Sequence, residues 1–287
     1  MFDFSIFAYG FMQRAFGVGI LLAVIIPCIG MVIVLRRQSM IGDALSHTSL
    51  AGVAIGLIFG FNPVLGAVAA CMVAALGIEA IRKKFPGHAE LSIAIIMSAG
   101  ISLAGVLSGF VKNSANFNSF LFGSIVAISD FELGLVLITS ILILAAFLVL
   151  YKELFLISLD EQAARLAGVP VRLVNFIFTL MTAVTVSIAA RTVGALIVSS
   201  LMVVPVICAM QIGRSYRQTL IWSVGFALLF TIAGLFLSYY IGLKPGATIV
   251  LAGIAGLLIV LLLKNLLVRH RQRTASFRVP SDPSHVK

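Results

Sequence analysis

Residues 41–60 read IGDALSHTSLAGVAIGLIFG and combine two patterns that fit on one helix. An α-helix turns by about 100° per residue, so Asp43 and His47, four residues apart, lie on the same side of it. Gly52 and Gly56 lie on roughly the opposite side. Glycines at this spacing let a second helix approach closely inside a membrane. The segment therefore predicts a membrane helix with an ionisable pair on one face and a tight helix contact on the other.

The rest of the chain has the composition of a membrane protein. Of its 287 residues, 61% are hydrophobic and only 10% are charged, and the mean hydropathy is +1.17. These values exclude a water-soluble domain and predict an all-α, multi-pass membrane helix bundle. Apolar segments of about 20 residues, the length that crosses a bilayer, can be placed nine times along the chain. The predicted spans are residues 15–35, 42–60, 63–81, 91–110, 133–151, 172–190, 193–212, 218–241 and 246–267.

Basic residues give these spans an orientation. If the loop that holds Arg36 and Arg37 is cytoplasmic and nine spans alternate, 16 of the 20 Lys and Arg residues lie inside and 4 lie outside. This bias explains the net charge of +10 without nucleic acid as a partner. It predicts a plasma (inner) membrane protein with an external N-terminus and a cytoplasmic C-terminus. Arg191 splits an apolar run over residues 172–212, and if that run crosses only once, the chain has eight spans.

The cytoplasmic link at residues 152–171 contains the signals of a short helix. Ser158 and Glu161 have the spacing of a capping box, and Gly168 can end a helix in a left-handed conformation. Together they predict a helix of about nine residues near 159–167. Such a helix has no apolar span of its own, so it needs either a protein partner or the lipid surface.

The remaining segments are less regular. Residues 111–132 form the longest external segment, which is either a gate or docking surface or a plain solvated loop. Residues 268–287 are basic, contain Pro280 and Pro283, and are predicted to form a disordered cytoplasmic tail beside anionic lipid. The membrane domain is then residues 1–267.

Few side chains in the predicted spans can bind a ligand. Cys28, Cys71 and Cys208 lack a paired spacing, so we interpret them as small buried hydrophobic residues. His47 is the only histidine within a span, and Asp43 is the acid nearest to it in sequence. Ionisable side chains inside a membrane are costly and by default mark a transport path. Asp43 and His47 are therefore the predicted site residues.

The chemistry of this pair points to a transition metal. One Asp and one His are too few for a closed metal site, which takes four ligands. A two-fold homodimer would supply two carboxylates and two imidazoles, a set that suits Zn²⁺, Mn²⁺ or Fe²⁺. Metal binding needs the neutral imidazole, so the affinity should fall in acid. Two alternatives are that Asp43 only hydrogen-bonds His47, or that it pairs with Arg36 or Arg37.

Two other chemistries are excluded. Ser46 and His47 are adjacent on a helix and point about 100° apart, so they cannot form a hydrolase dyad. The sequence contains no G-x-S-x-G segment and no G-x-x-x-x-G-K-[ST] segment. We therefore expect that this chain is not an enzyme, holds no permanent cofactor and does not bind ATP through a phosphate loop.

Three segments resemble one protein family. They are LRRQSMIGDALSH at residues 35–47, LDEQAARLAGVPV at 159–171, and TVGALIV at 192–198 followed by Val204-Pro205. In order and spacing they are similar to the membrane permease subunit of ABC importers for zinc, manganese and iron. The first segment is the most specific, and the similarity extends over residues 10–267.

The resemblance implies a homodimeric, all-helical permease of the vitamin B12 importer type, with two cytoplasmic ATPase subunits and an extracytoplasmic metal-binding protein. In that family the segment that matches 159–167 is the coupling helix that seats in the ATPase. The positions that match Asp43 and His47 bind metal inside the membrane. Family members often carry adjacent acids at the start of the fourth span, where this chain has Glu90 alone, so Glu90 is left out of the predicted site.

These inferences predict the membrane subunit of an ATP-driven importer that moves a divalent transition metal into the cytoplasm by alternating access. ATP would bind only to the partner subunits. The alternative is a secondary, proton-coupled metal transporter that uses the same Asp43 and His47 and needs no ATPase. The two ligand types suit zinc, manganese and iron alike, so the sequence does not select the metal.

Overall fold

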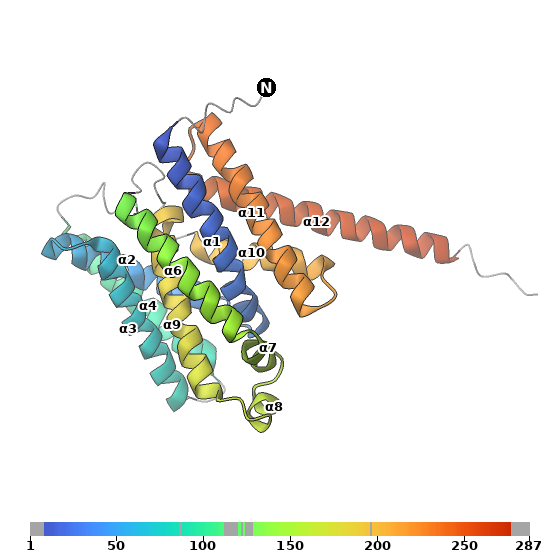
Figure 1. Cartoon of the computed structure of the whole chain (residues 1–287), viewed down its shortest axis with the longest axis horizontal. Coiled ribbons are helices and arrows are strands. Elements are labelled where there is room, and N and C mark those ends of the chain that lie inside the picture. The colour runs from blue at the N-terminus through green and yellow to red at the C-terminus, as the bar shows by residue number, and fades with distance from the viewer. Residues whose placement is uncertain are drawn as a thin grey trace, which may run out of the picture.

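The computed structural model describes residues 9–85, 88–111, 120–121, 123, 129–195 and 197–276, and every regular element within them is helical. In chain order the elements are α1 (Gly10–Leu35), α2 (Ile41–Phe59), α3 (Pro63–Lys84), α4 (Ala89–Ser108), α6 (Asp130–Val149), α7 (Tyr151–Leu159), α8 (Glu161–Leu166), α9 (Val171–Ala189), the π-helix η2 (Ala190–Gly194), α10 (Val198–Ile212), α11 (Tyr216–Ile241) and α12 (Pro245–Ser276). The predicted all-α membrane bundle is confirmed (Figure 1).

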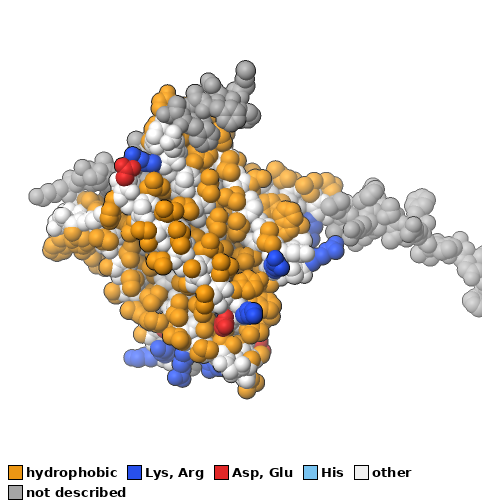
Figure 2. All heavy atoms as spheres, in the orientation of Figure 1, with side chains coloured by type: hydrophobic (Ala, Val, Ile, Leu, Met, Phe, Trp, Pro, Cys, Tyr) orange, Lys and Arg blue, Asp and Glu red, His pale blue; other side chains and the backbone are white. Residues whose placement is uncertain are grey.

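The bundle has α1, α2 and α9 at its centre. In each of these helices 67% of the residues in the 18-residue apolar window are buried inside the protein, whereas the share is 22% in α4 and in α12. Figure 1 shows α12 leaving the bundle, with its C-terminal half extending away from the other helices. Hydrophobic side chains cover the middle of the face in Figure 2, and Lys and Arg gather at its lower edge. Lipid around a helix bundle requires such an apolar belt, and an excess of Lys and Arg at one edge is typical of membrane proteins.

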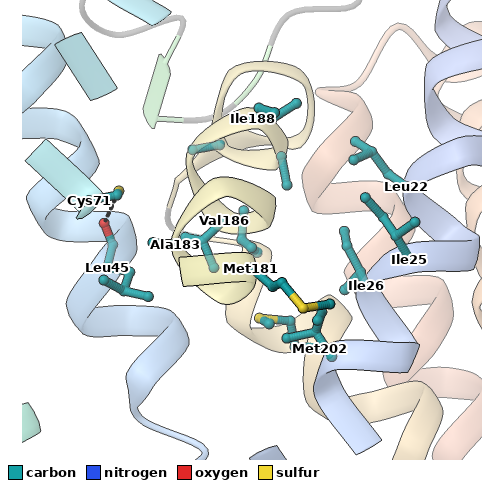
Figure 3. Packing of buried hydrophobic residues seen from close by; sticks show 14 of the residues in the cluster. Leu22, Ile25, Ile26, Leu45, Cys71, Met181, Ala183, Val186, Ile188 and Met202 are labelled. Atoms are coloured by element: carbon teal, nitrogen blue, oxygen red, sulfur yellow. Dashed lines mark hydrogen bonds between the residues drawn. The ribbon is translucent and has the colours of Figure 1, made fainter. Parts of the chain in front are cut away.

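One part of the hydrophobic core lies between α1, α9 and α10. Figure 3 shows Leu22 and Ile26 of α1 on one side and Met181 of α9 beside Met202 of α10. All four belong to a single cluster of buried hydrophobic residues. The cysteines are free and buried, as predicted, at Cys28, Cys71 and Cys208.

The glycine face of residues 41–60 packs as the sequence predicts. A Cβ added to Gly52 would overlap the carbonyl oxygen of Gly66 on α3, and one added to Gly56 would lie 2.8 Å from the Cα of Pro63. Two backbones come this close only where side chains are absent. The contact sets the rotation of α2 about its own axis, and so the direction of its opposite face.

Eight helices in the described part of the chain are long and apolar enough to cross a membrane. The predicted span 193–212 is occupied mainly by the 15-residue α10, which is about 22 Å long at 1.5 Å per residue. Both ends of this segment nevertheless contact α12, the first end near the start of α12 and the second end further along it. The carbonyl of Val193 occupies the place of a Cβ on Gly246, and Gln211 accepts a hydrogen bond from Lys264 at 2.9 Å. The segment therefore runs alongside α12, which is one of the eight candidates.

The predicted capping box at Ser158 is wrong. Ser158 lies inside α7, where its hydroxyl donates to the carbonyl of Leu154 at 2.6 Å. Asp160 is the N-cap of α8, because its side chain accepts the backbone N–H groups two and three residues later. The short helix has six residues and begins directly after α7. Gly168 follows it with φ +84°, in the left-handed conformation that the sequence predicts.

The end of the chain is more regular than expected. α12 continues to Ser276, past the predicted end of the last span at residue 267, so the first part of the predicted disordered tail is helical. The rest of that tail, residues 277–287, lies outside the described residues, as do residues 1–8 and most of the external segment 111–132.

Candidate functional site

Both predicted site residues lie at the N-terminal end of α2. The helix begins at Ile41, so Asp43 stands in its first turn and His47 one turn later. The unpaired backbone N–H groups at a helix start favour a carboxylate there. Both side chains are half-buried. The structure therefore brings the carboxylate and the imidazole together on adjacent turns of one central helix.

The pair belongs to a stripe along α2 whose residues alternate in spacing between three and four. The stripe consists of Met40, Asp43, His47, Leu50 and Ala54. Exposure falls along it: Met40 is 49% exposed, the ionisable pair is half-buried, and Leu50 and Ala54 are only 3% and 0% exposed. The pair lies at the boundary between an open end and a closed interior. An ion bound there would be reached from the Met40 end and blocked at the Leu50 end.

Neighbouring helices cover the other sides of α2. A Cβ on Gly42 would lie 2.8 Å from the hydroxyl of Ser199 on α10. On another side, a Cβ on Gly100 of α4 would lie 2.6 Å from the hydroxyl of Thr48. With α3 on the glycine face and α9 also in contact with α2, four helices surround α2, and the 100° step per residue directs the stripe away from α3. Leu50 and Ala54 are covered within the chain, so only the end of the stripe at Met40, Asp43 and His47 is left for a path or a second protomer.

Two serines near the pair were not identified from the sequence as part of the site. The hydroxyls of Ser46 and Ser199 are buried and have no hydrogen-bond partner in the described part of the chain. Ser46 lies one turn beyond Gly42 on the side of α2 that faces Ser199. An unpaired buried hydroxyl costs free energy, so this contact between α2 and α10 is polar but unsatisfied. No local pattern in the sequence could have found Ser199, because only tertiary packing brings α10 to α2.

The pair does not form a complete metal site within one chain. Among the described residues, no three His, Cys, Asp or Glu side chains converge as a metal site would require. Asp43 and His47 thus supply two donors per chain, which cannot enclose a metal ion. Glu90 is exposed at the start of α4 and lines a cavity of about 590 Å³ together with His88 and Met40. Glu90 therefore borders the open end of the stripe and does not join the pair.

A second cavity, of about 470 Å³, opens beside α8 between the ends of α3 and α9. Its charged lining consists of Arg36, Glu79, Arg82, Lys83, Glu161, Arg165 and Arg172. Glu79 pairs with Arg82. Burial lowers the pKa of Arg36 to about 10, so its guanidinium is charged at neutral pH. Arg36 donates to the side chain of Asn175 at 3.0 Å, and the ion pair it forms is with Glu161 and not with Asp43.

The chain matches known transport proteins over most of its length. Residues 8–264 match the model of the ABC 3 transport family. A manganese transport system membrane protein of Listeria innocua is 33% identical over 85% of this chain and 87% of its own length. A high-affinity zinc uptake system membrane protein of Haemophilus influenzae is 28% identical over 81% of this chain and 90% of its own length.

A solved structure extends the similarity to the fold. A chain of PsaBC from Streptococcus pneumoniae, solved in complex with Fab, is 27% identical to this chain and superposes with a TM-score of 0.80. The superposition covers 89% of this chain and 92% of that one. The resemblance carried by the three sequence segments is thus confirmed over nearly the whole length. This chain belongs to the ABC 3 transport family.

Proposed function

We propose that this chain is the membrane subunit of an ATP-driven importer that moves a divalent transition metal ion into the cytoplasm. The observation that carries the proposal is the half-buried pair of Asp43 and His47, placed on a stripe of α2 that is open at one end and closed at the other. Membership of the ABC 3 family supports the transporter class, and the relatives serve manganese and zinc systems. A secondary transporter is not favoured, because the family is one of ABC transporters.

The donor types of the pair support a metal ion as the cargo. Asp43 offers a carboxylate oxygen and His47 a neutral imidazole nitrogen, which together suit zinc, manganese and iron. Because the stripe faces away from α3, two protomers related by a two-fold axis could place two such pairs opposite each other. A site of four donors shared between subunits can open when the subunits move apart, as a transported ion requires.

The surface of α8 supports docking of a cytoplasmic ATPase. Ala164 faces the bundle and is 1% exposed, whereas Leu166 is 91% exposed and Leu159, at the end of α7, is 66% exposed. Leucines that project from a short polar helix are suited to burial in a protein partner. In the proposed importer each protomer seats α8 in one ATPase subunit, and an extracytoplasmic protein delivers the metal at the opposite side of the plasma membrane.

The gradient of exposure along the stripe fits one state of an alternating-access cycle. If Met40 is near the cytoplasm, the pair is open to the inside and closed to the outside by Leu50 and Ala54. ATP binding and hydrolysis on the partner subunits would drive the exchange between this state and an outward-open one. Differential affinity of the pair for metal in the two states would give the transport its direction.

Metal uptake tests the proposal. Cells that lack their own high-affinity importers would express the complete importer, and radioactive manganese, zinc and iron would be offered separately. Asp43→Ala and His47→Ala should each reduce uptake of one metal to less than about a tenth, because loss of a direct ligand costs more than the 10–100-fold typical of an outer-shell partner. The metal whose uptake is lost identifies the cargo.

Two matched variants test whether the loss of any aspartate or any histidine in the chain reduces uptake. Asp282→Ala and His270→Ala remove the same side-chain types from the C-terminal tail, and both should transport at the wild-type rate. All variants must reach the membrane in equal amounts and still co-purify with the ATPase. If Asp43→Ala and His47→Ala transport normally under these conditions, the pair is structural and the proposal is wrong.

A further inference from the structure

Arg36 links three helices that are far apart in the sequence. It is the first residue after α1, and its guanidinium donates a hydrogen bond to Asn175 of α9 at 3.0 Å. It also faces the carboxylate of Glu161 on α8 at 3.9 Å. Only 8% of the Arg36 side chain is exposed. A planar guanidinium that is buried and shared between two helices is held in a defined position.

The ion pair of Arg36 with Glu161 is long and lies close to the distance at which a hydrogen bond would form. At 3.9 Å the two groups attract but are too far apart for a hydrogen bond, so a shift of α8 by about 1 Å would form that bond or separate the pair. Glu161 also binds Arg165 at 2.6 Å, but that pair lies within α8. Among the described residues, the ion pair that joins α8 to another part of the chain is therefore the one between Glu161 and Arg36. The cavity of about 470 Å³ beside α8 leaves space for such a shift.

The turn after Arg36 is stiff and leads straight to the site. The backbone N–H groups of Arg37 and Gln38 bond back to the last turn of α1 at 3.1 and 2.9 Å, and that of Ile41 bonds to Gln38 at 3.0 Å. Arg37 adopts φ +56°, a left-handed conformation that is uncommon for a residue with a side chain. α2 then begins, with Asp43 in its first turn. A displacement of Arg36 is therefore passed on to the start of α2, because the hydrogen-bonded turn cannot absorb it.

We propose that Arg36 is the positioning residue that couples α8 to the pair of Asp43 and His47. When α8 moves, the attraction between Glu161 and Arg36 changes. Arg36 then moves the turn that begins α2, and with it the two metal ligands. The inference rests on the proposed function, in which the ATPase moves α8, and it adds the residue through which that movement reaches the metal.

The test uses the complete importer in proteoliposomes and the metal that the wild type transports. Three quantities are measured: co-purification of the ATPase, basal ATP hydrolysis and metal uptake. Arg36→Gln can still donate to Asn175 but loses the charge that attracts Glu161. Assembly and basal hydrolysis should stay within about twofold of wild type, whereas uptake should fall about tenfold, inside the range usual for coupling between two sites.

Lys83→Gln is the matched control. Lys83 lines the same cavity, so the substitution removes one positive charge from the same place, but it lies on α3 and not on the link between α8 and α2. Uptake by Lys83→Gln should equal that of the wild type. If uptake by Lys83→Gln falls as far as uptake by Arg36→Gln, then uptake depends on the total charge of the cavity and not on the contact between Arg36 and Glu161. The inference is then wrong.

A charge exchange tests the contact directly. Arg36→Glu should lose uptake at least as severely as Arg36→Gln, and adding Glu161→Arg should restore it about fivefold or more, within the usual range of site coupling. The amide of Asn175 can rotate so that its NH₂ group donates to the new carboxylate. No restoration, or a fall in basal hydrolysis as large as the fall in uptake, would show that Arg36 only maintains the fold.

Asp43→Ala keeps this inference separate from the proposed function. If Asp43→Ala abolishes uptake and Arg36→Gln does not, the metal site stands and only the coupling role of Arg36 is wrong. If the wild-type importer takes up none of the three metals, the proposed function fails and the coupling role fails with it.

Discussion

The glycines of this bundle differ in what surrounds each Cα. At Gly52 of α2, an added Cβ would overlap the carbonyl oxygen of Gly66, whereas at Gly105 of α4 nothing lies within 4 Å of an added Cβ. A backbone carbonyl in a packed helix cannot rotate away as a side chain can, so strain at Gly52 has no easy relief. The same residue type is thus required at one position and replaceable at the other.

Alanine substitutions measure this difference. Gly52→Ala should destabilise the protein by about 1–3 kcal/mol through overpacking, whereas Gly105→Ala should cause no loss, because alanine favours a helix over glycine. The midpoint of thermal unfolding of each purified variant in detergent is the measurement. If Gly52→Ala unfolds at the wild-type temperature, α2 and α3 do not pack backbone to backbone.

At the scale of elements, η2 (Ala190–Gly194) explains why an arginine splits the apolar run over residues 172–212. Nε of Arg191 donates to Glu132 of α6 at 2.8 Å, and the guanidinium lies 4.5 Å from the ring centre of Phe120. The other carboxylate oxygen of Glu132 accepts the N–H of Ser129 in a capping box. A π-helix inserts an extra residue and so redirects a side chain, here toward a buried ion pair.

Removing the charge of Glu132 should therefore weaken the joint between α6 and η2. Glu132→Gln keeps one oxygen for the capping box but leaves Arg191 without its anion, so the expected destabilisation is about 2–4 kcal/mol. Asp130→Asn is the control, because Asp130 forms a more exposed pair with Arg14 that is worth about 0–1 kcal/mol. Thermal unfolding compares the two variants, and equal midpoints would show that the buried pair adds nothing to stability.

At the scale of the whole molecule, the number of crossings decides on which side each loop lies. The contacts of Val193 with Gly246 and of Gln211 with Lys264 indicate that α10 and the segment before it cross alongside α12. Five crossings then separate the end of α3 from the turn between α11 and α12. If α10 did not cross, four would separate them and both positions would face the same side.

Labelling with a thiol reagent that cannot pass the membrane tests this count. Leu243→Cys should react in intact cells, and Lys84→Cys should react only after the membrane is opened, because an odd number of crossings separates them. The native thiols are buried and should give little background, at Cys28, Cys71 and Cys208. Reaction of both new cysteines from the same side would rule out the ninth crossing.

The parts of the site that the sequence predicted are local. The relation of Asp43 to His47 depends only on the repeat of one helix, and the contact of Gly52 with α3 follows from glycine spacing. The start of α8 was missed although it is also local, because Asp160 and Ser158 are both good N-caps and only the packed structure extends α7 past the serine. Ser199 was not identified as a neighbour of the site, and the contacts of Arg36 with Asn175 and Glu161 were not predicted, because these residues lie on distant helices.

By itself, the sequence determined that this chain is a multi-pass helical membrane protein and which family it resembles, and it predicted the two side chains that we propose bind the metal. These properties follow from apolar run length, charge and the 100° step of a helix, all of which act within one segment. Only the tertiary structure decided that the stripe holding Asp43 and His47 closes at Leu50, and that Arg36 lies between Asn175 and Glu161. Burial and contacts between segments depend on how helices pack, and no single segment contains that information.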